Sequence, residues 1–246
     1  MELLSAEKTD GMAEIIESVR NKLRELSYEK TRNSSERFFK EKIRVHGVRS
    51  ALVSSIAKGS FRILNGKSKK EIFELCDELW RSGYIEETFI ACIWAYELRK
   101  KYEPADFNVF SEWIHKYVDN WASCDTLCNH TLGTFIEMYP EFISALKKWT
   151  GSENRWVRRA SAVTLIIPAR RGRMLPDVLD IADKLLTDGD DMVQKGYGWM
   201  LKEASRNHRE VIFKYVTDNK KIMPRTALRY AIEKMPPDYR KAAMEK

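Results

Sequence analysis

The chain has 246 residues, 43% of them hydrophobic, and a formal net charge of +7. That apolar content excludes a globally disordered protein, and 11 Gly with 7 Pro are too few for a many-turned all-β fold. Residues 1–150 carry 23 Lys and Arg against 23 Asp and Glu, whereas residues 151–246 carry 20 against 13, so the positive excess lies in the last 96 residues and predicts a surface for a polyanion, most often nucleic acid.

Helical periodicity dominates the chain in order from its N-terminus. A first helix is predicted over Met12–Leu26, and Asn33, Ser34 and Ser35 offer capping oxygens for a short helix over Glu36–Ile43. Ser68 precedes Glu71 by three residues, a capping-box spacing that predicts a helix ending near Arg81. Further helices are predicted over 84–101, 104–117, 121–139, 140–150, 153–170, 175–187, 190–206, 210–217 and 224–234.

The breaks between these helices are short and carry Pro, Gly, Asn or Asp, which favours antiparallel neighbours joined by tight turns. We therefore predict an all-α fold, a superhelical solenoid of HEAT-like antiparallel helix pairs with a concave basic face. No linker interrupts the pattern, so residues 1–246 are predicted to form a single domain, with an N-terminal helix in 1–30 and fraying at 1–10.

The sequence also suggests where the protein resides. Residues 1–8 are polar with no apolar core, and no apolar run approaches the 18 residues that a membrane span needs, so we expect no signal peptide and no membrane association. We expect a cytoplasmic location, nucleoid-associated if the source is a prokaryote, and a monomeric protein. Reduced and mostly buried thiols are expected for the four cysteines, Cys76, Cys92, Cys124 and Cys128.

Trp121 and Asp125 are four residues apart, so an indole and a carboxylate share one face of a predicted helix. One interpretation is a boundary tryptophan beside a solvated or capping aspartate. The other is a site in which the aromatic face holds a sugar or base while the carboxylate faces a cationic centre.

Two basic stretches follow in the second half of the chain. Arg155 and Arg159 are one turn apart with Arg158 on the flank, and guanidinium forks match phosphate oxygens, although a solvated charged face would look the same. A stripe at i, i+4, i+7 and i+11 interleaves cations with an aromatic side chain, a pattern that suits nucleic acid: Lys195, Trp199, Lys202 and Arg206.

Gly196 and Gly198 lie in the same predicted helix, and each lowers helix stability by about 1 kcal/mol relative to Ala. This cost indicates close packing or close approach of a ligand. A metal site is not expected, because Cys124 and Cys128 in a helix with no second ligand pair have poor zinc spacing. No phosphate-binding loop, dinucleotide fingerprint or nucleophile elbow is present, and no cofactor is predicted.

Taken together, these motifs occur in the order found in the AlkD-like DNA alkylation repair glycosylases. The chain resembles that family in Trp121-x-x-x-Asp125, in Asn154–Arg159 and in Gln194–Trp199. Phe38-Phe-Lys40 is similar to the family's N-terminal aromatic-plus-Lys segment, although relatives often carry a Tyr where Phe38 stands. The resemblance covers roughly residues 30–235.

The resemblance implies a HEAT-like glycosylase that wraps duplex DNA and excises cationic N3- or N7-alkylated purines without a metal or cofactor. Asp125 matches the family's catalytic carboxylate, Trp121 and Trp199 its lesion-flanking indoles, and Arg159 its backbone-contacting arginine, with Phe38 in the DNA-binding set. Further phosphate contacts are predicted at Arg155, Arg158, Lys195, Lys202 and Arg206. Two alternatives remain open, a HEAT-repeat module that binds nucleic acid without turnover and a scaffold whose basic face meets an acidic protein.

Overall fold

The computed structural model describes the backbone of residues 2–245 and the side chains of residues 11–245. Across this part of the chain the protein is all-α, and its only β pairing is an isolated parallel bridge between Arg44 and Tyr84. The chain folds into two compact units, a first unit of residues 1–123 and a second unit of residues 124–246. The all-α class is therefore confirmed, whereas the superhelical solenoid, its basic face and the single 1–246 domain stay predictions.

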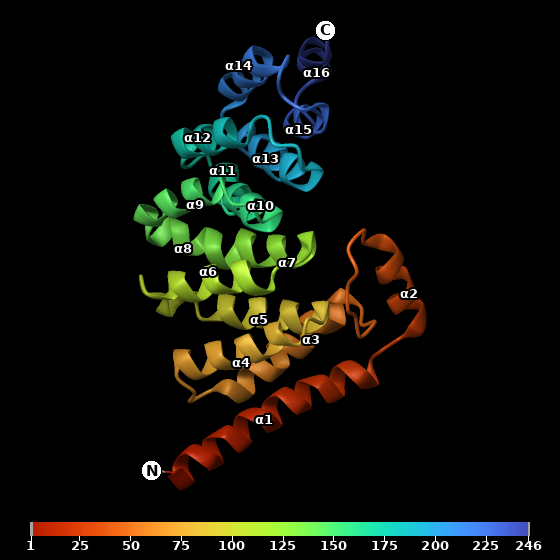
Figure 1. Ribbon diagram of the computed structural model, residues 1–246, viewed down its shortest axis with the longest axis vertical. Helices are drawn as coiled ribbons and strands as arrows, with labels where there is room; N and C mark the ends of the chain where they lie inside the picture. The colour runs from red at the N-terminus through yellow and green to blue at the C-terminus, as the bar shows by residue number, and fades with distance from the viewer. Residues whose placement is uncertain (1, 246) are drawn as a thin grey trace. The chain divides into compact units, whose positions relative to one another are not determined.

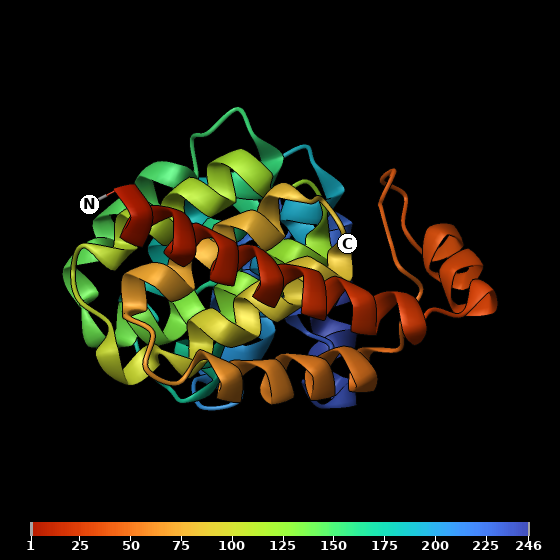
Figure 2. The ribbon, with the colours of Figure 1, turned by 90° about the horizontal axis from the view of Figure 1, so that it is seen from below.

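The first unit is a stack of helices, α1 (Glu2–Glu25), α3 (Ser50–Phe61), α4 (Lys69–Arg81), α5 (Ile85–Glu97) and α6 (Asp106–Tyr117). In this unit α5 packs against α3 and α4, and α1 contacts the same two helices from the other side (Figures 1 and 2). Helix α5 is buried around most of its circumference, with Ile90, Ala91 and Trp94 at 0% exposure. The predicted capping box at Ser68 and Glu71 is present at the start of α4.

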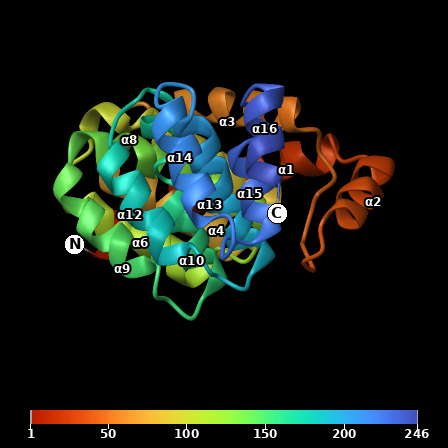
Figure 3. The ribbon, with the colours of Figure 1, turned by 90° about the horizontal axis from the view of Figure 1, so that it is seen from above.

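Helix α2 (Glu29–Phe38) and the extended segment 39–49 differ from the rest of the first unit. None of the residues of α2 is buried, and the helix stands apart from α1 and α3 (Figures 2 and 3). The prediction of a helix over Glu36–Ile43 is wrong, because the helix begins at Glu29 and ends at Phe38, and residues 39–43 are not helical. The predicted capping residues Asn33–Ser35 lie inside α2. Because this helix buries none of its residues, no pattern of buried side chains marks where it begins.

The second unit contains α8 (Gly133–Met138), α9 (Ile143–Trp149), α10 (Arg155–Val163), α11 (Ile166–Arg170), α12 (Leu175–Leu185), α13 (Asp191–Ala204), α14 (Arg209–Asn219), α15 (Arg225–Ala231) and α16 (Pro237–Met244). Helix α13 is central and packs against α10, α11, α12 and α15. Its N-cap, Asp190, accepts hydrogen bonds from the amides of Met192 and Val193, as the predicted start at residue 190 requires.

Two helices predicted as continuous are interrupted. Residues 121–139 form α7 (Trp121–Thr126), a π-helical turn at Leu127–Leu132 and then α8. Residues 155–170 divide into α10 and α11, because Pro168 has no N–H to donate to the carbonyl of Thr164. That carbonyl instead lies against Gly133, where an added Cβ would stand 2.9 Å from the oxygen. The absence of a side chain at Gly133 therefore allows the two interruptions to meet.

Candidate functional site

A buried ion pair between Asp125 and Arg159 is the centre of the candidate site. Arg159 Nε donates to Asp125 Oδ1 at 2.9 Å, and Nη2 donates to Oδ2 at 2.8 Å, a bidentate geometry. The third nitrogen, Nη1, donates to the carbonyl of Met192 at the start of α13. The side chains are 13% and 5% exposed, so most of the pair is removed from water. Residues 34 positions apart in the sequence are thus joined at both carboxylate oxygens.

Local structure fixes the position of Arg159. Asn154 caps α10 by accepting a hydrogen bond from the amide of Trp156 at 2.9 Å, which sets where the helix begins and therefore which face carries Arg159. On α13, Gly196 leaves room for the arginine, because an added Cβ would lie 3.2 Å from Arg159 Cγ and 3.4 Å from Nη1. The helix-weakening glycine predicted to mark close packing therefore packs on the arginine of the candidate site.

Burial and the ion pair act in opposite directions on Asp125. Burial raises the pKa of its carboxyl, the Arg159 guanidinium lowers it, and the net pKa lies above the ordinary value. For Arg159, burial lowers the pKa and Asp125 raises it, with a net increase. A guanidinium remains charged at any physiological pH, so we take the pair as ionised, with a carboxylate that accepts a proton more readily than a solvated aspartate.

The two cysteines nearest Asp125 in the sequence are buried. All four cysteines are free and buried, as expected, and two of them, Cys124 and Cys128, flank Asp125 in the sequence. Cys124 Sγ donates to the carbonyl of Trp156 at 3.7 Å, which ties α7 to α10. Burial raises the pKa of Cys124 well above its usual range, so this thiol serves packing rather than nucleophilic chemistry.

Trp199 lies two turns along α13 from Met192 and is half-buried. Its indole Nε1 donates to Glu203 Oε1 at 3.4 Å. Glu203 is 3% exposed and also accepts from Arg170 at 2.7 Å and from Arg206 at 2.6 Å. Burial raises the pKa of Glu203, but the two arginines hold it below its ordinary value, so a charged carboxylate orients the indole.

The other cations predicted to contact phosphate in the second unit all have acidic partners. Arg155 pairs with Asp190 at 3.3 Å and Arg158 with Asp188 at 2.7 Å, and Arg158 also donates to the carbonyls of Ser152 and Glu153. In the stripe on α13, the pairs are Lys195–Asp191 at 2.9 Å, Lys202–Glu233 at 3.1 Å and Arg206–Glu203 at 2.6 Å. These cations therefore lie on the helices predicted for them, but the fold neutralises their charges internally.

The aromatic residues predicted in the first unit gather at the C-terminal end of α2. Phe38 is 71% exposed, and its ring lies 5.9 Å from that of Trp121 in an edge arrangement. Phe39, which sequence reasoning did not single out, stacks on Trp121 with ring centroids 5.2 Å apart and planes at 15°. The three rings border a cavity of about 320 Å³ beneath α2. An aromatic platform is thus present, with one face of the Trp121 indole covered by Phe39.

Comparison with known proteins identifies the family. The model of a family described as DNA alkylation repair enzyme matches residues 19–235. The chain belongs to this family. Among solved structures, one described as a predicted DNA alkylation repair enzyme from Enterococcus faecalis aligns with a TM-score of 0.76 at 13% identity, over 86% of this chain and 97% of that chain, a likeness that shows the fold. No match was found among curated proteins.

The residues matched to the DNA alkylation repair enzyme family include Asp125 and Arg159. Among the side chains of residues 11–245, no group of three or more His, Cys, Asp or Glu residues is placed to hold a metal ion. No helix in the described part of the chain is both long enough and apolar enough to cross a membrane.

Glu203 and Phe39 are the residues of this family member that sequence reasoning missed. Glu203 stands four positions after Trp199, the spacing that signals a shared helix face, and was a detectable partner for the indole. Phe39 follows Phe38 directly, and only the helix register decides which of the two rings lies flat on Trp121.

Proposed function

We propose that the protein is a DNA glycosylase of base excision repair that hydrolyses the N-glycosidic bond of cationic N3- or N7-alkylated purines in duplex DNA. Asp125 is the catalytic carboxylate of this proposal, and the activity needs no metal or cofactor. The observation that carries it is the buried, bidentate Asp125–Arg159 pair, in a chain of the DNA alkylation repair enzyme family.

One carboxylate is sufficient for this reaction. An N3- or N7-alkylated purine already carries a positive charge, so the electron pair of the breaking bond between C1′ and the base nitrogen neutralises the leaving base without a general acid. The sugar becomes oxocarbenium-like, and a nearby carboxylate stabilises that charge. Water then adds to C1′ and loses a proton to Asp125 or to solvent.

Arg159 has a positioning role in this mechanism. An ionised carboxylate offers about four lone-pair sites, and Arg159 takes two of them, which leaves acceptor capacity for a water or for the sugar. Each of the three guanidinium nitrogens donates within the protein, and the residue is 4% exposed. The predicted contact of Arg159 with the DNA backbone stays a prediction; the contacts described favour orientation of Asp125.

The aromatic residues supply attraction for a cationic base or sugar. We assign Trp121 and Trp199 to recognition of the lesion, because a cation over an indole face gains about 0.5–2 kcal/mol, and Phe38 to DNA contact. The hydrogen bond from Trp199 to Glu203 preorganises one of these indoles. In this proposal, DNA phosphates replace the acidic partners of five further cations, Arg155, Arg158, Lys195, Lys202 and Arg206.

Release of free base from methylated duplex DNA tests the proposal. Wild-type protein is expected to release 3-methyladenine or 7-methylguanine above the spontaneous rate, and Asp125→Asn is expected to abolish the excess. Asp119→Asn, which removes an equal charge from an exposed position six residues earlier, is the matched control and is expected to retain activity. If wild-type protein releases no alkylpurine above the spontaneous rate, the proposed activity is wrong.

A further inference from the structure

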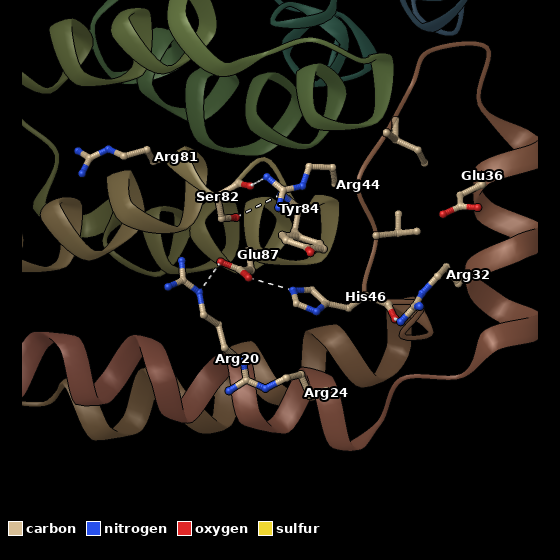
Figure 4. A pocket seen from close by; sticks show the side chains of 12 residues that line it. Arg20, Arg24, Arg32, Glu36, Arg44, His46, Arg81, Ser82, Tyr84 and Glu87 are labelled. Atoms are coloured by element: carbon tan, nitrogen blue, oxygen red, sulfur yellow. Dashed lines mark hydrogen bonds and ion pairs between the residues drawn. The ribbon is translucent and has the colours of Figure 1, made fainter.

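The first unit contains a cavity lined by five arginines, although residues 1–150, which include this unit, have no excess of positive charge. The cavity has a volume of about 720 Å³ and lies between α1, the start of α5 and the extended segment 39–49 (Figure 4). We call it the arginine pocket after the five arginines that line it, Arg20, Arg24, Arg32, Arg44 and Arg81. Its acidic lining consists of Glu36 and Glu87. The pocket therefore has an excess of three positive charges, apart from His46.

Two of these arginines have only neutral partners. Arg32 Nη2 donates to Ser27 Oγ at 3.1 Å and to the carbonyl of His46 at 3.2 Å. Arg44 Nη1 donates to the carbonyl of Ser82 at 2.9 Å, and its guanidinium lies 4.4 Å from the centre of the Tyr84 ring. Among the described side chains, neither arginine has a carboxylate within ion-pair distance. Their charges are therefore oriented but not neutralised.

The segment that carries Arg44 is anchored to α5. The Arg44 carbonyl accepts a hydrogen bond from the amide of Ile85 at 3.0 Å, beside the β-bridge to Tyr84. Glu86, 5% exposed, accepts from the amides of three successive residues, His46 at 2.9 Å, Gly47 at 2.8 Å and Val48 at 3.1 Å. The backbone of the segment is thus held in place before any ligand arrives, which lowers the entropic cost of binding.

A second carboxylate, Glu87, closes the floor of the pocket and explains why not every arginine there is available. Arg20 Nε donates to Glu87 at 3.1 Å, and His46 Nε2 contacts the same carboxylate at 2.9 Å (Figure 4). Arg24 and Arg81 bind neighbours on their own helices and are 52% and 62% exposed. The arginines with neutral partners, Arg32 and Arg44, are therefore the strongest anion-binding groups of the set.

We propose that the arginine pocket binds phosphate groups, supplied by a DNA strand or by a free nucleotide. Guanidinium forks match phosphate oxygens in a bidentate manner, and two such forks with unneutralised charge line one cavity. With a DNA strand as the source, the inference rests on the proposed function, and the pocket holds the backbone of the substrate in the first unit. With a nucleotide as the source, it is an independent small-molecule site.

Salt-dependent binding of an unmodified DNA duplex tests the first source. Each phosphate contact contributes about 0.9 to the slope of log K against log salt, so Arg44→Gln and Arg32→Gln are each expected to lower the slope by about 1. Arg62→Gln is the matched control, because it removes the same charge from an exposed position of the first unit outside the pocket. It is expected to leave the slope unchanged.

Binding of adenosine triphosphate to the same four proteins tests the second source. The duplex slope could be equal in all four proteins. A nucleotide site then requires that wild-type protein and Arg62→Gln bind the triphosphate. Arg44→Gln is expected to bind it at least tenfold more weakly. Equal duplex slopes together with no pocket-dependent binding of the triphosphate overturn the proposal.

Folding must be separated from binding in these variants, because Arg44 and Arg32 hydrogen-bond to the backbone. Arg44→Lys and Arg32→Lys keep the charge and are expected to retain most of the slope. Should a Gln variant unfold early in thermal denaturation, its slope is measured below the midpoint of that transition, where the variant is still folded. Base release is measured separately, so loss of the pocket and loss of the proposed activity are distinguishable outcomes.

Discussion

The two units use positive charge in opposite ways. The second unit holds the excess of Lys and Arg, yet each cation of its predicted phosphate-contacting set is paired with a carboxylate. Residues 1–150 have no excess of positive charge, yet the first unit, which lies within them, contains the arginine pocket. Two guanidiniums of this pocket have only neutral partners. Net charge along a sequence therefore does not locate available charge, because pairing in the fold decides which cations can meet a ligand.

The largest expected effect tests whether the catalytic carboxylate of the second unit acts separately from the arginine pocket of the first unit. Removal of one catalytic carboxylate costs about 10²–10⁴-fold in rate, so Asp125→Asn is expected to slow single-turnover base release by that factor. The same variant is expected to keep the salt slope of duplex binding, whereas Arg44→Gln lowers it by about 1. If Asp125→Asn lowers the slope as much as Arg44→Gln, the division between the units is wrong.

The next effect concerns the ion pairs of the second unit. Arg159→Ala leaves the buried Asp125 carboxylate without a partner, and breaking such a pair costs about 3–5 kcal/mol in the free energy of unfolding. Denaturant titration of the purified variant measures this loss. Arg171→Ala is the control, because its bond to Glu137 is made by a side chain that is 54% exposed and is expected to contribute about 1 kcal/mol or less. Equal losses in the two variants would contradict a structural role for the buried pair.

A smaller effect distinguishes the two glycines of α13. At Gly198 an added Cβ would lie 2.7 Å from both the carbonyl of Ala227 and Tyr230 Cβ, so Gly198→Ala forces α13 and α15 apart and is expected to cost about 1–3 kcal/mol. At Gly196 the nearest atom, Arg159 Cγ, would lie 3.2 Å from an added Cβ, so a smaller shift of the neighbouring atoms is enough to make room. Gly196→Ala is therefore expected to be less destabilising in denaturant titration while displacing Arg159, which a slower base release would report.

The sequence predicted most helices because their buried faces repeat at the helical period. That signal is absent in α2, which buries none of its residues, so its register could not be predicted. Helix α3 was missed although Val53, Ile56 and Ala57 supply the spacing, a signal that the sequence did offer. Motifs in the sequence identified the candidate site residues, but not the partners that lie far from them in the sequence.

These partners could not be predicted because the paired residues lie far apart in the sequence. Arg159 meets Asp125 across 34 residues, and Lys202 meets Glu233 across 31. Pairing at such separations depends on tertiary packing, which no local pattern encodes. The arginine pocket was missed for the same reason, since α1, α2, α4 and the segment 39–49 each contribute arginines that look like ordinary surface residues in their own stretch of sequence.

The smallest effect concerns acid stability of the first unit. Burial raises the pKa of Glu87, but the hydrogen bond from His46 and the charge of Arg20 lower it below its ordinary value of 4.5. Because the folded-state pKa is the lower one, this carboxylate contributes stability that is fully present above the ordinary value and is lost as the pH falls through the folded-state pKa. Glu87→Gln is therefore expected to reduce the free energy of unfolding at neutral pH, and the difference from wild type is expected to shrink in acid. Glu74→Gln, at an exposed position of α4, serves as the control and is expected to show no such pH-dependent difference. A Glu87→Gln deficit that stays constant across this pH range would show that the charge of Glu87 does not stabilise the fold through His46 and Arg20.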